Sequence, residues 1–189
     1  MKPGLKPRPT TEKEKEELTD LTIRAATTDD TESLHALISG HQREGHLLPR
    51  SLDEVRRHAG RFIVCDVDGE ITACAELAPL SAEVAEVRSL VVARHFRRVG
   101  LAARLVGELR QRAKAAGYET LCAFTHDARF FVRQNFSIVP HLSVPEKITT
   151  DCLSCPLFRK CGQYAMVLPL HEIPRYGTAA PTVYRTAVA

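Results

Sequence analysis

Hydrophobic positions recur along the chain with two different periods, which predict strands and helices in alternation. A period of two, rich in β-branched residues, predicts strands over residues 21–25, 61–67, 70–77, 86–93, 120–125, 136–139 and 164–170. Apolar residues three and four apart predict helices over residues 29–43, 51–59, 100–116 and 128–134. This alternation is typical of an α/β or α+β domain around a central mixed sheet.

Local signals support several of these boundaries. Asp68-Gly69 separates two strand runs and predicts a hairpin. Ser51 and Glu54 match a capping box at the start of a helix. In the third helix a buried stripe is expected at Leu101, Leu105, Leu109 and Ala113.

The 189 residues suffice for one domain, which we assign to residues 20–170. Residues 1–19 combine prolines with a mixed-charge run and predict a flexible N-terminal arm. Residues 171–189 show no periodicity and predict a C-terminal tail.

Composition narrows the class of protein. Hydrophobic residues make up 44% and charged residues 26% of the chain, and the formal net charge is +3, with the charges interspersed. We therefore expect neither a nucleic-acid nor a membrane partner, and the polar start of the chain predicts a cytoplasmic location. A homodimer is left open. In the cytoplasm, the six cysteines are expected to be thiols or metal ligands rather than disulfides.

The segment from Glu86 to Leu105 carries the strongest functional signal. A strand ends near Ala93, a turn with three arginines follows, and Gly100 opens an alanine-rich helix. Amides at a helix start have no intrahelical partner, and nearby arginines add charge, so this pattern favours a pyrophosphate site. A solvated basic turn that caps an ordinary helix is the alternative.

The run Arg97-Arg98-Val99-Gly100-Leu101-Ala102 resembles the [Q/R]-x-x-G-x-[G/A] loop of the GNAT acetyltransferases, and the element order over residues 21–170 is also similar. The resemblance implies a single domain with a mixed, mostly antiparallel sheet flanked by helices. It implies acetyl-CoA as cosubstrate, with its pyrophosphate on the loop and its pantetheine arm along one strand. The implied cofactor-binding residues are Leu90, Val91, Val92, Arg97, Arg98, Val99, Gly100, Leu101, Ala102 and Ala103.

A narrower resemblance is to bacterial N-acetylglutamate synthases, which begin arginine biosynthesis. Residues 44–55, the strand around Glu86, and the C-x-x-C-P-x-F-x-x-C run within residues 144–161 are similar to short forms of that group. The resemblance implies L-glutamate as acceptor. It also implies substrate contacts for Arg50, Lys147 and Arg159, and Arg88 is added because arginine pairs well with carboxylates.

Attack of an amine on a thioester needs a base and an oxyanion donor. Glu86 lies eleven residues before Arg97, where histone-acetylating members of the family place a catalytic glutamate. It is the candidate base, and an ion pair with Arg88 is the alternative. The amide of Leu90 is the candidate oxyanion donor. The family often places a tyrosine acid at the position of Phe131, and His126 is a weaker candidate for that role.

Cys152, Cys155 and Cys161 have metal-like spacing but supply three thiolates, whereas a closed zinc site needs four ligands. His141, His171 and Cys122 are candidates for the fourth ligand. Structural zinc or iron, reduced loop thiols and a Cys152–Cys155 redox pair all stay open. Two functional alternatives also remain, namely acetylation of another amine, such as a peptide N-terminus, and a non-catalytic regulator that senses CoA or metal.

Overall fold

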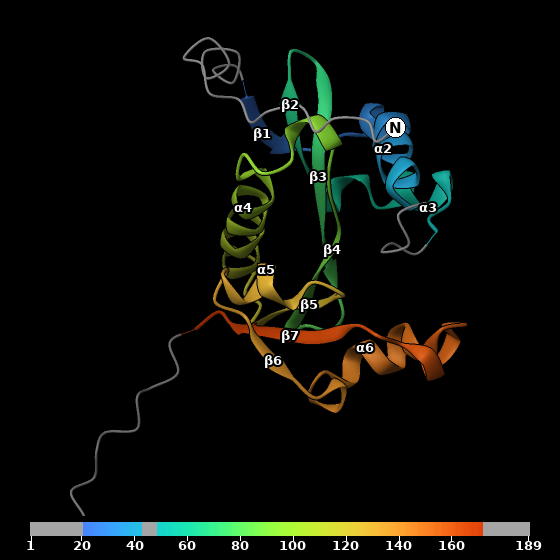
Figure 1. Cartoon of the computed structure of the whole chain (residues 1–189), viewed down its shortest axis with the longest axis vertical. Helices are drawn as coiled ribbons and strands as arrows, with labels where there is room; N and C mark the ends of the chain where they lie inside the picture. The colour runs from blue at the N-terminus through green and yellow to red at the C-terminus, as the bar shows by residue number, and fades with distance from the viewer. Residues whose placement is uncertain (1–20, 43–48, 172–189) are drawn as a thin grey trace, which may run out of the picture.

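The structure is a computed structural model that describes residues 21–42 and 49–171 of the chain. The predicted N-terminal arm lies outside the described residues, as does the predicted tail after His171. A seven-stranded sheet forms the centre, and helices lie on both of its faces (Figure 1). The predicted α/β domain around a mixed sheet is therefore confirmed.

The strands are arranged in the order β1-β2-β3-β4-β5-β7-β6. Their bounds are β1 (Leu21–Ala25), β2 (Phe62–Val67), β3 (Glu70–Pro79), β4 (Val84–Val92), β5 (Thr120–Thr125), β6 (Ser137–Val139) and β7 (Tyr164–Pro169). Neighbouring strands are antiparallel except β4 and β5, which are parallel. The sheet is thus mixed and mostly antiparallel.

Within residues 21–42 and 49–171, five α-helices connect the strands. They are α2 (Thr31–Gln42), α3 (Leu52–Arg57), α4 (Leu101–Ala115), α5 (Ala128–Val132) and α6 (Pro145–Thr150). Short 3₁₀ turns are η1 (Thr28–Asp30), η2 (Ala59–Arg61), η3 (Arg94–Phe96), η4 (His141–Ser143), η5 (Cys152–Ser154) and η6 (Phe158–Lys160). The sequence did not predict α6. None of the described helices has the length and apolar run needed to cross a membrane.

The two faces of the sheet bury separate clusters, because successive strand residues point to opposite sides. In β2, Ile63 and Cys65 join the cluster beneath α4, whereas Phe62 and Val64 join the cluster with α2 and α3. The predicted stripe of α4 is buried against the first face. The opposite face of the sheet carries the charged residues of the site.

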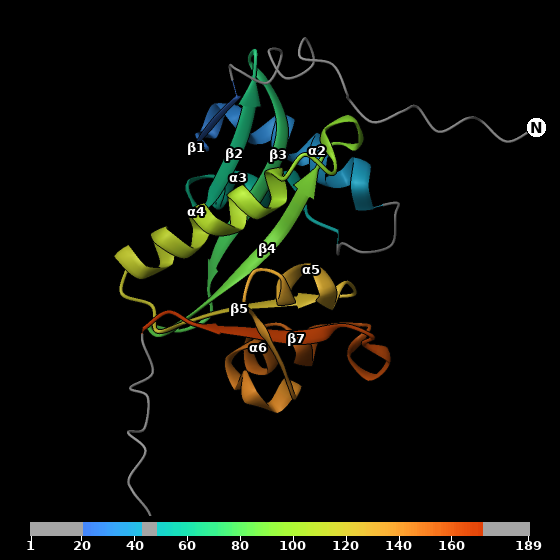
Figure 2. The ribbon, with the colours of Figure 1, turned by 60° about the vertical axis from the view of Figure 1, so that its left-hand side comes forward.

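β4 and β5 pair over a short stretch and then separate. Their pairing runs from Val84 with Thr120 to Val87 with Ala123, although β4 continues to Val92. Figure 2 shows the two strands diverging beyond this stretch. The register between β3 and β4 also shifts beside Ser89, whose φ of 48° marks a bulge in β4. The end of β4 therefore presents an edge without a partner from β5.

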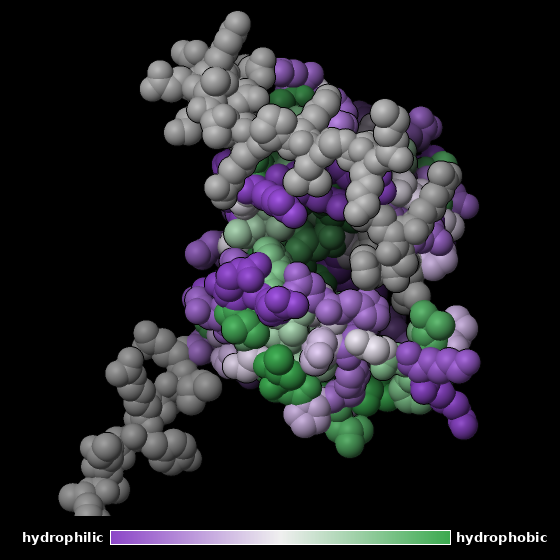
Figure 3. Space-filling view, in the orientation of Figure 1, coloured by the Kyte–Doolittle hydropathy of each residue, from purple (hydrophilic) through white to green (hydrophobic). Residues whose placement is uncertain are grey.

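The segment around α6 buries few side chains and exposes several large apolar ones. Neither α6, η5 nor η6 contributes a buried residue. Figure 3 shows hydrophobic surface in the lower part of the molecule, where α6 lies in Figure 1. The exposed large side chains of this region are Leu142, Leu153, Leu157 and Phe158.

Candidate active site

The turn between β4 and α4 surrounds a cavity of about 450 Å³. Arg98 and Gly100 have positive φ angles of 70° and 89°, which bend the chain so that α4 begins at Leu101. Amides in the first turn of α4 lie at the positive end of the helix dipole without intrahelical partners. Predicted loop residues that line this cavity are Arg97, Arg98, Gly100, Leu101, Ala102 and Ala103, whereas Val99 packs against the core.

A larger cavity of about 950 Å³ lies beside the open edge of β4. Leu90, Val91 and Val92 line this cavity, as the predicted position of a pantetheine arm requires. Val92, Arg97 and Ala102 line both cavities, so the two form adjoining spaces along the same edge. A long ligand with an anionic end fits this arrangement, with the anion at the start of α4 and the remainder along β4.

Three of the four predicted substrate residues line the larger cavity. Arg50 precedes α3, Arg88 lies on β4, and Lys147 lies on α6, so elements far apart in sequence bring three cations together. Arg159 is exposed on η6 and is not part of the cavity wall. We therefore leave Arg159 out of the acceptor site proposed below.

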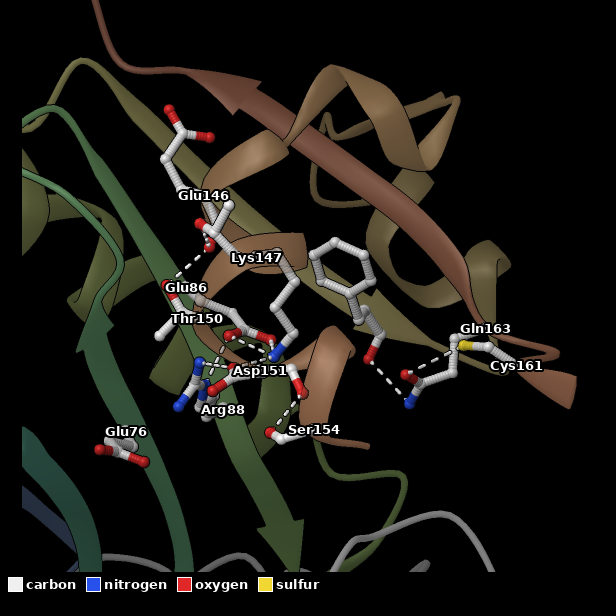
Figure 4. A network of polar contacts seen from close by, with 12 residues as sticks. Glu76, Glu86, Arg88, Glu146, Lys147, Thr150, Asp151, Ser154, Cys161 and Gln163 are labelled. Carbon is white, nitrogen blue, oxygen red and sulfur yellow. Dashed lines mark hydrogen bonds and ion pairs between the residues drawn. The ribbon is translucent and has the colours of Figure 1, made fainter. Parts of the chain in front are cut away.

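Glu86 lies at the centre of a network of ion pairs (Figure 4). Its carboxylate accepts hydrogen bonds from Lys147 Nζ at 2.8 Å and from Arg88 Nε, and its side chain is 4% exposed. Asp151 also pairs with both cations, and its Oδ2 lies 2.8 Å from Lys147 Nζ. Burial alone would lower the pKa of Arg88, but the charges of Glu86 and Asp151 raise it above its ordinary value.

A second buried carboxylate, Glu76, forms its ion pairs on the side of α3. It lies opposite Arg88 in the β3–β4 register, and its side chain is 1% exposed. Its Oε2 lies 2.9 Å from Arg50 Nη2, and Arg50 Nη1 donates to Glu54 at 2.8 Å. Arg50 is thus held between two carboxylates at the cavity wall. The ion pair between Glu86 and Arg88, which is the alternative to a catalytic role, is present in the structure. Glu86 also lines the larger cavity, as the proposed base must.

Phe131 is buried among Phe130 and Phe136, with ring centroids 5.0 Å and 5.2 Å away. The Phe131 side chain itself carries no phenolic hydroxyl. His126 and His141 both line the larger cavity, and the ring of His141 packs against Phe124 at 5.6 Å. Asn135 adopts a φ of 67°, a conformation that glycine or asparagine tolerates best.

Cys152, Cys155 and Cys161 line the same cavity as free thiols. Burial raises the pKa of Cys152, which favours its thiol over its thiolate when no metal is bound. Across residues 21–42 and 49–171, no three His, Cys, Asp or Glu side chains are arranged to hold a metal ion. Zinc or iron at these cysteines stays a prediction, which elemental analysis of protein purified without added metal tests.

Sequence reasoning missed Asp151, Glu76 and Glu54. A signal for Asp151 was present, since Pro145 suits the first turn of a helix and Lys147 lies four residues before Asp151. Glu76 gave no such signal, because its partner Arg50 is distant in sequence and becomes its neighbour through the packing of the loop before α3 on the sheet.

The acetyltransferase (GNAT) family model matches residues 21–136. An N-acetyltransferase of Chlorobaculum tepidum, CT2212, is 30% identical over 151 residues, which cover 80% of this chain and 97% of that protein. An amino-acid acetyltransferase of Azotobacter vinelandii is 33% identical over 116 residues, which cover 60% of this chain. This chain spans about a quarter of that longer relative, since the match covers 27% of it.

A solved structure of N-acetylglutamate synthase from Neisseria gonorrhoeae, complexed with coenzyme A and N-acetyl-glutamate, superposes with a TM-score of 0.73. It is 25% identical in sequence, and the match covers 80% of this chain and 35% of the synthase. The family model, the relatives and the arrangement of strands point to the same family as the loop at residues 97–102. The chain belongs to the acetyltransferase (GNAT) family and, within it, is similar to amino-acid acetyltransferases.

Proposed function

We propose that this protein transfers the acetyl group of acetyl-CoA to the α-amine of an amino acid, with L-glutamate as the acceptor. The product would be N-acetyl-L-glutamate, and the reaction would belong to arginine biosynthesis. Similarity to the synthase complexed with coenzyme A and N-acetyl-glutamate supports this proposal. The argument from this chain's own residues rests on one arrangement of charges.

The supporting observation is that opposite charges lie side by side next to the open edge of β4. Glu86 supplies a carboxylate, and Arg88 and Lys147 supply cations within hydrogen-bond reach of it. An amino acid carries an ammonium and a carboxylate two bonds apart, so it can pair with both kinds of side chain at once. Arg50, held at the same cavity wall, is available for the second carboxylate of glutamate.

Glu86 is the proposed base. Both of its oxygens contact Lys147 Nζ at 2.8 Å, so an acceptor ammonium must displace Lys147 or lose its proton to Glu86 through a water molecule. The amide of Leu90, beside the bulge at Ser89, is the proposed donor to the developing oxyanion. The loop amides from Arg98 to Ala103 would hold the pyrophosphate, and acetyl-CoA supplies the thioester.

The proposal is tested by measuring release of free thiol from acetyl-CoA with each of the twenty amino acids. We expect glutamate to give the highest kcat/KM, with glutamine well below it because one carboxylate is missing. Equal values for glutamate and glutamine would exclude the glutamate assignment. If peptides or polyamines are acetylated and amino acids are not, the acceptor belongs to a different class of amine and the proposal is wrong.

A further inference from the structure

Asp151 places a carboxylate on the two cations that an acceptor carboxylate would need. It directly follows α6, and its Oδ2 contacts both Arg88 and Lys147 Nζ, the latter at 2.8 Å. In Figure 4 the side chains of Lys147 and Arg88 converge on Asp151 and Glu86. A carboxylate of an amino acid presents the same two oxygens as an aspartate, so both compete for one position.

Of the two carboxylates in this cluster, Asp151 is the one that can move. Its side chain is 32% exposed, whereas that of Glu86 is 4% exposed on a central strand. Val144 before α6 is buried, but α6 and the turn after Asp151 contain no fully buried residue, so little packing free energy holds the Asp151 end of the segment in place. Displacing Asp151 breaks its ion pairs with Arg88 and Lys147, and an incoming carboxylate restores pairs with the same two cations.

We propose that Asp151 occupies the acceptor carboxylate subsite in the free enzyme and is displaced when the acceptor binds. The acceptor carboxylate then pairs with Arg88 and Lys147, and the Asp151 side chain turns to solvent. Both carboxylates cannot stay at one position, because like charges at contact distance repel. The inference rests on the proposed function in one respect, that the acceptor carries a carboxylate.

This displacement makes Asp151 a specificity-determining residue. An amine without a carboxylate cannot replace Asp151 on Arg88 and Lys147, so it finds the subsite closed. For a carboxylate ligand, the apparent affinity is reduced by the fraction of molecules in which Asp151 is in place. Removing the charge of Asp151 should therefore strengthen binding of the acceptor rather than weaken it.

The test compares Asp151→Asn with Glu146→Gln. Both variants remove one negative charge from the same segment, but the Glu146 carboxylate points away from the cluster in Figure 4. We expect Asp151→Asn to lower the acceptor KM by about three- to fivefold, the factor that corresponds to a partly exposed ion pair. The acetyl-CoA KM should stay within about twofold, and Glu146→Gln should match the wild type.

A higher acceptor KM in Asp151→Asn, or one equal to that of Glu146→Gln, overturns the proposal. If the variant proves unstable, Asp151→Ser provides a second measurement with the same expected direction. Calorimetric titration of glutarate, a dicarboxylate without an amine, separates this inference from the proposed function. Tighter glutarate binding by Asp151→Asn without any turnover of glutamate supports the displacement and refutes the acetylation of glutamate. Turnover of glutamate without tighter glutarate binding refutes the displacement alone.

Discussion

Glu86 is a buried carboxylate that pairs with two cations, and its proposed role as the base predicts the kinetic effect of removing its charge. It contacts both Arg88 and Lys147, and it lies on the strand along which the thioester is proposed to bind. We expect Glu86→Gln to lower kcat by about 10²–10⁴-fold while the acetyl-CoA KM changes little. Steady-state kinetics of both substrates measures this.

Glu76→Gln is the matched control, since Glu76 is equally buried on the neighbouring strand but contacts Arg50 instead. This control should change the acceptor KM and leave kcat near the wild-type value. A loss below threefold in Glu86→Gln, with an unchanged pH–rate profile, would assign deprotonation to water alone.

Arg50 also stabilises the fold, because it neutralises the buried carboxylate of Glu76. Glu76 is 1% exposed, so Arg50→Ala leaves a carboxylate buried without its cation. Losses of about 3–5 kcal/mol in the free energy of unfolding are usual for this situation. We expect the double variant Arg50→Ala/Glu76→Gln to recover most of that loss, as urea unfolding of the single and double variants would show.

The double variant also permits a clean test of the acceptor site. In it, preference for glutamate over glutamine should fall, because the proposed partner of the second carboxylate is absent. Single variants whose destabilisations simply add would mean that Arg50 and Glu76 are not coupled.

Individual elements were largely readable from the sequence because their patterns are local. The strands at residues 21–25 and 120–125 have the predicted bounds, since alternation and β-branching suffice there. The predicted helix over 29–43 instead begins as the 3₁₀ turn η1, where Asp30 accepts from the Thr27 amide at 2.7 Å. The predicted helix over 51–59 stops at Arg57, and η2 follows at Ala59.

The site was less predictable than the fold because it is assembled from distant segments. Arg50 and Glu76 lie 26 positions apart in the printed sequence, and Lys147 and Glu86 lie 61 apart. No periodicity links such pairs. The family resemblance predicts substrate roles for Lys147 and Arg50. Asp151 and Glu76 become their neighbours only through the packing of α6 and of the loop before α3 on the sheet.

The proposed pyrophosphate site at the start of α4 can be tested by introducing a negative charge there. Gly100 has a φ of 89° and open space where a Cβ would be, so Gly100→Glu adds backbone strain and a negative charge beside the loop amides. We expect this variant to lose acetyl-CoA binding in calorimetry. The loss follows because the added carboxylate would repel the pyrophosphate.

Gly117 offers a matched control at the other end of α4. It has a φ of 84° and equally open space, so Gly117→Glu adds the same strain far from the loop. Its acetyl-CoA affinity should remain that of the wild type. Equal losses in both variants would indicate damage to α4 rather than loss of a phosphate site.

At the scale of the whole molecule, one ion-pair cluster ties the first strand to the rest of the domain. Arg24 of β1 pairs with Asp30 at 2.7 Å and with Asp66 of β2 at 2.9 Å. The hydrogen bonds from Arg24 lower the pKa of Asp30 from 3.8 to about 2. Because the pKa is lower in the folded state, the stabilisation is present above the unfolded value of 3.8 and is lost as the pH falls through about 2.

We expect Asp30→Asn to lower the free energy of unfolding at pH 7 by about 2 kcal/mol and to flatten its decline in acid. Urea unfolding at pH 7, 5, 4 and 3 measures both effects. Asp53→Asn is the control, because Asp53 is 81% exposed and its pair with Arg56 is worth little. Parallel acid profiles for the wild type and Asp30→Asn would contradict the assigned role of Arg24.

The short pairing between β4 and β5 has a mechanical consequence. Along the sheet, the strands β1 to β4 are joined to β5, β7 and β6 through the four residue pairs from Val84 with Thr120 to Val87 with Ala123. Beyond this junction the two blocks can tilt apart without breaking a ladder hydrogen bond. A ligand whose own amides bond to the free edge of β4 would act as an inserted strand and brace the two blocks. Hydrogen exchange of the backbone amides of Leu90 to Val92 should then slow when such a ligand binds and holds the two blocks together.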